Sequence, residues 1–229
     1  IGGDEFTIII ENYTDEDSLF ELCNQLFECM EKSFVIYEHT LTLSLSIGIA
    51  IYPHSGIDTA TLLKNANVAM YDAKAKELNS VSIYDDVIAK KIELRLEKDL
   101  PNAIQNEELF LLYQPQVDSK SNKIIGAEAL IRWNHPELGV ISPYEFIPIA
   151  EETLQIISIG KWTLEQACKQ MKRWHALGYS HLKIGVNLSA KEFEQEDFVK
   201  SISATLTNTG LPASSLDLEL TERIAMMDE

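Results

Sequence analysis

The chain has 229 residues, of which 45% are hydrophobic and 24% are charged, so it can bury an ordinary globular core. Its formal net charge of −17 at pH 7 argues against a nonspecific nucleic-acid binder, which would carry a basic surface, and we expect no nucleic-acid polymer as a partner. No apolar run is long enough to span a membrane, so we expect cytoplasmic domains, and an anchor upstream of residue 1 stays open.

The cysteines and the chain ends add two expectations. Cys23, Cys29 and Cys168 show no metal-binding or disulfide spacing, and we interpret them as reduced thiols of a cytoplasmic protein. The chain lacks an initiator Met, begins inside a predicted strand and stops without a closing element. We therefore expect an internal piece of a longer protein.

The first region, residues 1–86, mixes strand and helix patterns. Gly2-Gly3 before the β-rich residues 6–10 is typical of a hairpin turn that leads into a strand. Thr14 and the acids after it mark the start of a helix, whose apolar spacing continues to about Glu31. Strict alternation over residues 41–51 predicts a half-buried strand. A helix over 59–76 and a short strand over 81–84 complete the region.

The second region, residues 87–229, begins with a charged joining helix that extends to about residue 106. Two strands, 109–117 and 124–133, follow. Ser142-Pro143-Tyr144-Glu145 predicts a capping box, and the helix around Trp162 should end at Gly178. Strands over 183–188 and 216–222 flank a helix near 198–206. Such alternation of strands and helices indicates an α/β fold with parallel strands.

Polar residues recur on one face of these later strands. Strand parity places Glu128 and Arg132 on a common face, where burial is costly unless a cation and an anion meet them. The same parity places Asn187 and Glu219 on the strand faces opposite to those that carry the Ile, Val and Leu side chains. Two carboxylates and an amide oxygen suit Mg²⁺ or Mn²⁺, and Arg132 suits a phosphate.

Each of these residues also has an ordinary interpretation. A single Glu or Asn on a strand is more often a solvated edge residue. Ser189 with Glu192 forms a plausible capping box, which favours a helix cap over a ligand contact. The metal interpretation depends on three polar residues that fall at the same end of successive strands, where parallel α/β barrels place their active sites.

The second region resembles the EAL domain family, the cyclic di-GMP phosphodiesterases. The matching motifs, in chain order, are Tyr113-Gln114-Pro115, Glu128-Ala129-Leu130-x-Arg132-Trp133, Phe146-Ile147-Pro148-x-Ala150-Glu151, Asn187-Leu188-Ser189 and Glu219-Leu220-Thr221-Glu222. The resemblance implies a modified TIM-type barrel in which Glu128, Asn187 and Glu219 ligate the metal. It also implies that Gln114 and Arg132 contact the dinucleotide and that Glu222 steadies a neighbouring loop.

The activity implied is metal-assisted hydrolysis of cyclic di-GMP to the linear dinucleotide. The family's Asp-Asp metal pair, a Lys that helps activate water and a later Glu would lie beyond residue 229. We therefore expect residues 1–229 alone to be inactive, and we expect a homodimer in the parent protein.

The first region resembles the C-terminal half of a GGDEF domain, the diguanylate cyclase family. The motifs are Gly2-Gly3-Asp4-Glu5-Phe6, Leu45-Ser46-Ile47-Gly48-Ile49-Ala50 and Ala69-Met70-Tyr71-x-Ala73-Lys74. The resemblance implies that Gly2 and Gly3 let the backbone approach GTP. It implies that Asp4 and Glu5 hold Mg²⁺ and that Lys74 contributes to nucleotide binding.

One departure disfavours cyclase activity. After Lys74 the family continues with Gly-Arg-Asn, whereas this chain has Glu77, Leu78 and Asn79, so a phosphate contact is lost at Leu78. GTP binding without synthesis, as regulation of the hydrolase, is a hypothesis consistent with this change. The sequence therefore predicts a phosphodiesterase, with a cyclase and a non-catalytic cyclic di-GMP receptor as the alternatives.

Overall fold

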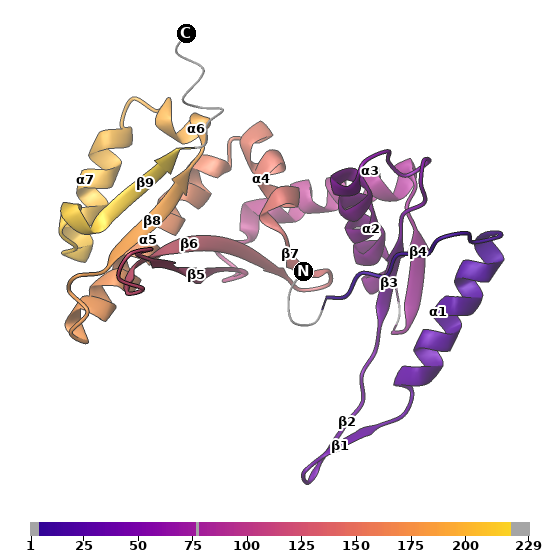
Figure 1. The fold of residues 1–229 in the computed structure, drawn as a ribbon. Helices are drawn as coiled ribbons and strands as arrows, with labels where there is room; N and C mark the ends of the chain where they lie inside the picture. The colour runs from indigo at the N-terminus through magenta and orange to yellow at the C-terminus, as the bar shows by residue number, and fades with distance from the viewer. Residues whose placement is uncertain (1–4, 77, 221–229) are drawn as a thin grey trace. The chain divides into compact units, whose positions relative to one another are not determined.

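The computed structural model describes residues 5–76 and 78–220 and contains two compact units, Ile1–Ile92 and Glu93–Glu229 (Figure 1). Both units mix helices and strands, as the sequence predicts. The division expected at residue 86 stays a prediction. The elements of the first unit are α1 (Glu16–Met30), β1 (Phe34–Ile36), β2 (His39–Leu41), β3 (Ser46–Ile49), α2 (Thr59–Lys74) and β4 (Ser80–Ile83), followed by α3 (Asp86–Asp99), which continues into the second unit.

Helix α1 begins one residue later than the acidic pattern suggests. Asp15, not Thr14, is the N-cap: its side chain accepts a hydrogen bond from the backbone N–H of Ser18 at 2.9 Å, and the Ser18 hydroxyl lies 3.4 Å from the Asp15 nitrogen. This reciprocal pair satisfies N–H groups that have no partner inside the helix. The helix then buries Leu19, Cys23 and Phe27 along one stripe.

The prediction of a strand over residues 6–10 is wrong. The structure has no strand there, and Phe6 and Ile9 are 87% and 85% exposed. A strand needs a hydrogen-bonding neighbour, and residues 6–10 pair with no other strand in the part of the chain that the structure describes. The Gly2-Gly3 turn predicted before it lies outside the described residues.

The strand predicted over 41–51 is shorter than its apolar alternation. Strand β3 covers only Ser46–Ile49, where it pairs in parallel with β4. Side chains from outside the sheet take the backbone N–H groups at both ends: Leu45 N–H donates to Asn79 Oδ1 at 2.9 Å, and Ile51 N–H donates to Ser55 Oγ at 3.0 Å. These bonds replace ladder bonds, so the strand stops.

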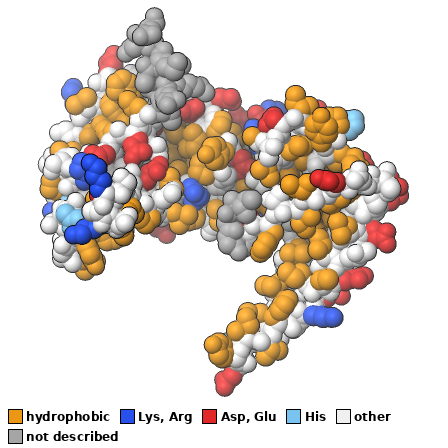
Figure 2. Space-filling view, viewed as in Figure 1, with side chains coloured by type: hydrophobic (Ala, Val, Ile, Leu, Met, Phe, Trp, Pro, Cys, Tyr) orange, Lys and Arg blue, Asp and Glu red, His pale blue; other side chains and the backbone are white. Residues whose placement is uncertain are grey.

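Two further segments of the first unit differ in exposure. β1 and β2 form a separate antiparallel hairpin whose apolar side chains, such as Val35, are exposed, and Figure 2 shows them gathered along it. β3, in contrast, packs closely on α2. A Cβ added at Gly48 would lie 2.0 Å from the carbonyl oxygen of Ala66, so the two backbones can approach this closely only because residue 48 is glycine.

The described residues of the second unit, 93–220, form one five-stranded sheet. Its order is β5-β6-β8-β9, and β7 pairs with β6. After α3 come a 3₁₀ turn (Leu100–Asn102), β5 (Leu109–Val117), β6 (Ile124–His135), β7 (Gly139–Ile141), α4 (Pro143–Glu152), α5 (Ile156–Ala176), β8 (Lys183–Leu188), α6 (Ala190–Phe193), α7 (Phe198–Thr209), a 3₁₀ turn (Ala213–Ser215) and β9 (Leu216–Leu220).

The direction of each strand pair follows from its connection. β5 and β6 are antiparallel because a short polar turn joins them, whereas β6–β8 and β8–β9 are parallel because helices join them. The parallel pairs confirm the sequence prediction. Helices α5 and α7 cover one face of the sheet (Figure 1). The core between them contains Ala127, Ala129, Leu164, Ala167, Cys168, Met171, Ile184, Val186 and Leu211.

The two predicted capping boxes have opposite outcomes. At α4, the Ser142 side chain makes no cap hydrogen bond, so that prediction is wrong. Pro143 occupies the first turn and has no N–H to satisfy, and the turn closes through the backbone, from Glu145 N–H to Ser142 C=O at 3.0 Å. At α6, Ser189 and Glu192 form both bonds of the box, as predicted.

Candidate functional site

Four strands carry polar side chains on the sheet face opposite α5 and α7. The register places Gln114 beside Glu128, Glu128 beside Gly185, and Asn187 beside Glu219. Register neighbours share a face, so the residues expected to act together lie on one surface of the sheet. The opposite parity supplies the core residues Ala127, Ala129, Ile184 and Val186.

Glu128 and Asn187 are in direct contact. The amide nitrogen of Asn187 donates a hydrogen bond to Oε1 of Glu128 at 2.6 Å. Glu128 is half-buried in the section of β6 that pairs with β8, and Asn187 is exposed near the end of β8. This short charge-assisted contact holds an anionic oxygen next to a polar amide at the surface of the sheet.

Arg132 shares the face of Glu128 but lies farther along β6. Four residues of strand separate the two Cα atoms by about 13 Å. The guanidinium donates from Nη1 to the backbone oxygen of Ile131 at 2.7 Å. A ligand that touched both side chains would therefore lie along this face of β6.

The end of β6 is held by buried aromatic side chains. Trp133 is fully buried and donates from Nε1 to Glu108 at 2.8 Å. Its ring packs edge-on against Phe146 of α4, with ring centroids 5.8 Å apart. His135, also buried, accepts backbone N–H bonds at Nδ1 from Glu137 and Leu138, so its Nε2 carries the proton that faces Asp99 at 3.1 Å. These contacts fix the backbone that presents Arg132.

Glu219 has a partner that the sequence reasoning missed. Gln116 donates from Nε2 to Oε1 of Glu219 at 3.2 Å. The signal was present, because Gln116 lies two residues after Gln114 and therefore on the same face of β5. On the same face, Nζ of Lys183 lies 3.3 Å from Oδ1 of Asp217. Both side chains are half exposed, so this ion pair adds little stability.

The donor set suits a hard divalent cation. Glu128 and Glu219 supply carboxylate oxygens, and the Asn187 amide supplies an oxygen once it rotates about its terminal bond. The residues from 5 to 76 and from 78 to 220 contain no group of three or more His, Cys, Asp or Glu side chains positioned for a metal. Two carboxylates and one amide are compatible with Mg²⁺ because this ion keeps several waters.

The first unit shows fewer of its expected site residues. Gly2, Gly3 and Asp4 lie outside the described residues, as does Glu222 in the second unit. Glu5 is exposed, and Lys74 is exposed in the last turn of α2. Leu78, where the resemblance implies an Arg, is 81% exposed. Only Glu5 and Lys74 of the residues expected to bind nucleotide in this unit are described, so that assignment stays a prediction.

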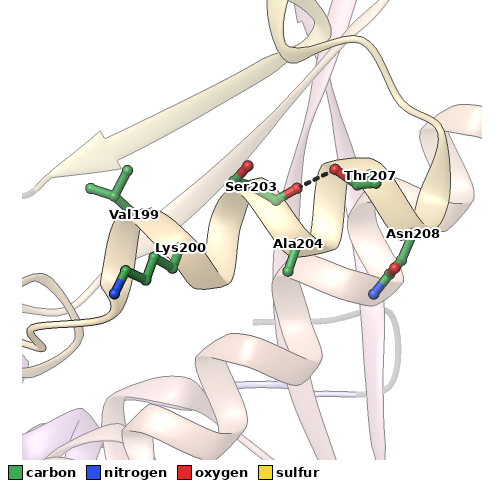
Figure 3. A pocket seen from close by; sticks show the side chains of 6 residues that line it. All are labelled: Val199, Lys200, Ser203, Ala204, Thr207 and Asn208. Carbon is green, nitrogen blue, oxygen red and sulfur yellow. Dashed lines mark hydrogen bonds between the residues drawn. The ribbon is translucent and has the colours of Figure 1, made fainter.

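A surface hollow on α7 is separate from the polar residues of the sheet face. Figure 3 shows its lining, which comes from one helix: Val199, Lys200, Ser203, Ala204, Thr207 and Asn208. It contains none of the polar residues of the sheet face.

None of the described helices combines the length and apolar character needed to cross a bilayer.

Comparisons with known families match both units. Residues 97–229 match the EAL domain, and residues 1–80 match the diguanylate cyclase, GGDEF domain. The chain is 42% identical over 229 residues to the signaling protein YkoW of Bacillus subtilis, with 99% of this chain and 28% of YkoW covered. It is 39% identical over 230 residues to MucR of Pseudomonas aeruginosa, a bifunctional diguanylate cyclase/cyclic di-GMP phosphodiesterase, with 100% and 33% covered.

A solved structure matches the fold of the second unit. The PaMucR phosphodiesterase, in complex with cyclic di-GMP, is 43% identical, with a TM-score of 0.57 and 58% of this chain and 54% of that chain covered. The chain spans about a third of the length of the curated relatives that it matches.

Proposed function

Because this chain belongs to the EAL domain family and carries a GGDEF domain match before it, we propose that the protein containing it is a metal-dependent cyclic di-GMP phosphodiesterase. One observation supports this most: Glu128 and Asn187 are in contact at 2.6 Å, and Glu219 is the register neighbour of Asn187. The three side chains that suit a divalent cation therefore lie together.

In this proposal each side chain has a distinct task. Glu128, Asn187 and Glu219 hold Mg²⁺ or Mn²⁺ through oxygen atoms. A bound cation supplies an acidified water and offsets charge on the phosphate oxygens. Glu222 steadies a neighbouring loop.

In the same proposal, two further residues contact the substrate. Arg132 grips a phosphate through its planar guanidinium, and Gln114, beside Glu128 in the register, contacts the dinucleotide. Cyclic di-GMP has two anionic phosphates, which suit both Arg132 and a cation held by Glu128, whose Cα lies about 13 Å from that of Arg132 along β6.

A second candidate activity rests on the match of residues 1–80 to the GGDEF domain. In that candidate, Asp4 and Glu5 hold Mg²⁺ on GTP, Gly2 and Gly3 admit the nucleotide, and Lys74 contributes to its binding. The replacement of the family's Arg by Leu78 favours GTP binding as regulation over synthesis. A homodimer, cytoplasmic domains and an upstream membrane anchor remain proposals for the full-length protein.

The test is a product assay. The full-length protein is incubated with Mg²⁺ or Mn²⁺ and either cyclic di-GMP or GTP, and products are separated by chromatography. Linear dinucleotide from cyclic di-GMP supports the phosphodiesterase. Cyclic dinucleotide from GTP supports the cyclase instead. Binding of cyclic di-GMP without any product identifies a receptor and contradicts both enzymatic assignments.

A further inference from the structure

One hydrogen bond on the polar face joins β5 and β9, the first and last strands in the order β5-β6-β8-β9. Gln116 on β5 donates from Nε2 to Oε1 of Glu219 on β9 at 3.2 Å, although β6 and β8 lie between these strands in the sheet. Adjacent strands are about 4.8 Å apart, so a flat sheet would separate β5 from β9 by about 14 Å. The two side chains therefore have to extend toward each other over β6 and β8.

Two glycines provide the path that the bond follows. A Cβ added at Gly126 of β6 would lie 3.1 Å from Gln116 Oε1, and one added at Gly185 of β8 would lie 3.5 Å from Gln116 Nε2. The amide thus extends over both strands where they have no side chains. A Cβ at Gly185 would also lie 2.4 Å from Glu219 Oε1, so any larger residue there must displace the carboxylate.

The local geometry of β5 directs Gln116 across the sheet. The register between β5 and β6 shifts between Gln116 and Val117. Such an irregularity bends a strand and changes the direction of its side chains. Gln116 is half-buried, whereas Gln114 is exposed, so the two glutamines differ in surroundings despite sharing a face.

The bond restricts a carboxylate that would otherwise rotate freely. The Gln116 amide takes one oxygen of Glu219, and the other oxygen stays available to a cation. Residues that orient a metal ligand by hydrogen bonding raise the affinity of the site because less order is lost on binding. No other side-chain hydrogen bond to Glu219 is found in residues 5–76 and 78–220.

We propose that Gln116 is a positioning residue that holds Glu219 in its metal-binding orientation, along a path that requires glycine at positions 126 and 185. This inference rests on the proposed metal-dependent function, because it assigns Glu219 to the divalent cation. It adds a residue that acts through Glu219 and does not touch the substrate.

The test measures Mn²⁺ affinity directly. The full-length protein and its Gln116→Met variant are titrated with Mn²⁺ by calorimetry, since methionine keeps the length of the side chain but loses the donor. We expect Mn²⁺ affinity to fall by roughly 10- to 100-fold. The matched control is Gln195→Met, which removes a surface amide bond to the Lys191 carbonyl and should leave affinity unchanged.

A double-mutant cycle separates positioning from a general structural effect. In a Glu219→Ala background, Gln116→Met should produce no further loss of Mn²⁺ affinity, because its partner is gone. Equal losses in both backgrounds would overturn the inference. Circular dichroism melts of each variant show whether the fold is retained. Unchanged Mn²⁺ affinity in a folded Gln116→Met variant would also overturn it.

The hydrolysis assay distinguishes this inference from the proposed function. If the wild type binds Mn²⁺ and Gln116→Met weakens that binding, the inference stands even when no cyclic di-GMP is cleaved. If the wild type cleaves cyclic di-GMP and Gln116→Met shows the same Mn²⁺ dependence of the rate, the inference fails and the function stands. A wild type that binds no Mn²⁺ contradicts both.

Discussion

The amide nitrogen of Asn187 lies 2.6 Å from Oε1 of Glu128, although the two residues are not register partners. The residue opposite Glu128 is Gly185, and Asn187 lies two positions farther along β8. The contact is therefore diagonal across two parallel strands. It is unobstructed because the residue directly opposite has no side chain.

This contact leads to a prediction for Glu128. Replacing Glu128 with alanine in the full-length protein should lower cyclic di-GMP hydrolysis by more than about 100-fold, because loss of a ligand costs at least as much as loss of an outer-shell partner. The melting temperature should change little because Glu128 is only half-buried. Glu165→Ala, on the surface of α5, is the matched control. Retained turnover in Glu128→Ala would refute the metal assignment.

A buried carboxylate in the first unit gives a pH prediction. Burial of Asp72 opposes its ionisation, but hydrogen bonds from Lys76, Lys91 and Ser82 outweigh burial and hold the pKa of this carboxyl at about 2. The ordinary Asp value is about 3.9, so the folded state favours the ionised form. The resulting stability is present above pH 4 and is lost as the pH falls toward 2.

The Asp72→Asn variant isolates this contribution. Urea unfolding of the chain at several pH values should show the wild type to be more stable than the variant at pH 5. That difference in unfolding free energy should shrink by about 2 kcal/mol by pH 2. Asp197→Asn is the control, because the Asp197 side chain is exposed and makes no cap hydrogen bond at α7. A difference that does not depend on pH would contradict the ion-pair explanation.

Glu192 gives a prediction of opposite sign. Burial raises the pKa of this carboxyl, the backbone and side-chain bonds from Ser189 partly oppose the rise, and the charge of Glu151 adds to it. The stability linked to this group is complete below the ordinary Glu value of about 4.3 and falls as the pH rises through the folded pKa. Glu192→Gln keeps an acceptor for Ser189 and removes the buried charge.

The melting temperature of Glu192→Gln should therefore exceed that of the wild type at pH 8, and the gain should disappear near pH 4. Glu192→Ala should be less stable than the wild type at both values, because it loses the capping box at α6. A Glu192→Gln variant that melts below the wild type at pH 8 would show that the charged form is favoured in the fold.

The cysteines should react at very different rates. Cys29 is exposed, whereas Cys23 and Cys168 are buried. Burial raises the pKa of the Cys23 thiol and raises that of Cys168 to about 11, so little thiolate is present at pH 8. Iodoacetamide labelling followed by peptide mass spectrometry should modify Cys29 at least about 10-fold faster. Equal labelling of Cys168 would mean that the α5 core opens readily.

Local patterns were sufficient for much of the second unit. The alternation in β8 and β9 correctly assigned the face of Asn187 and Glu219, because successive side chains of a strand point to opposite faces. The Ser189–Glu192 capping box was also predicted correctly, since its two bonds join residues three positions apart. The helix-connected strands were parallel, as their connections require.

Hydrogen-bonding partners outside the strands decided the elements that the sequence analysis predicted wrongly. The alternation over residues 41–51 continues past both ends of β3, but Asn79 and Ser55 take the backbone groups there. Residues 6–10 have a strand-like composition, yet they form no strand because they have no hydrogen-bonding neighbour in the described part of the chain. The apolar alternation of a segment does not show where such partners lie.

The sequence by itself determined which side chains share the polar face, because strand parity is a local property of the backbone. Only the tertiary structure decided which of them touch. The diagonal offset of Asn187 from Glu128 depends on the register of β6 and β8, and the contact of Gln116 with Glu219 depends on the open space over two glycines. Register and the alignment of side chains across several strands arise from the packing of whole strands and helices, so no single strand encodes them.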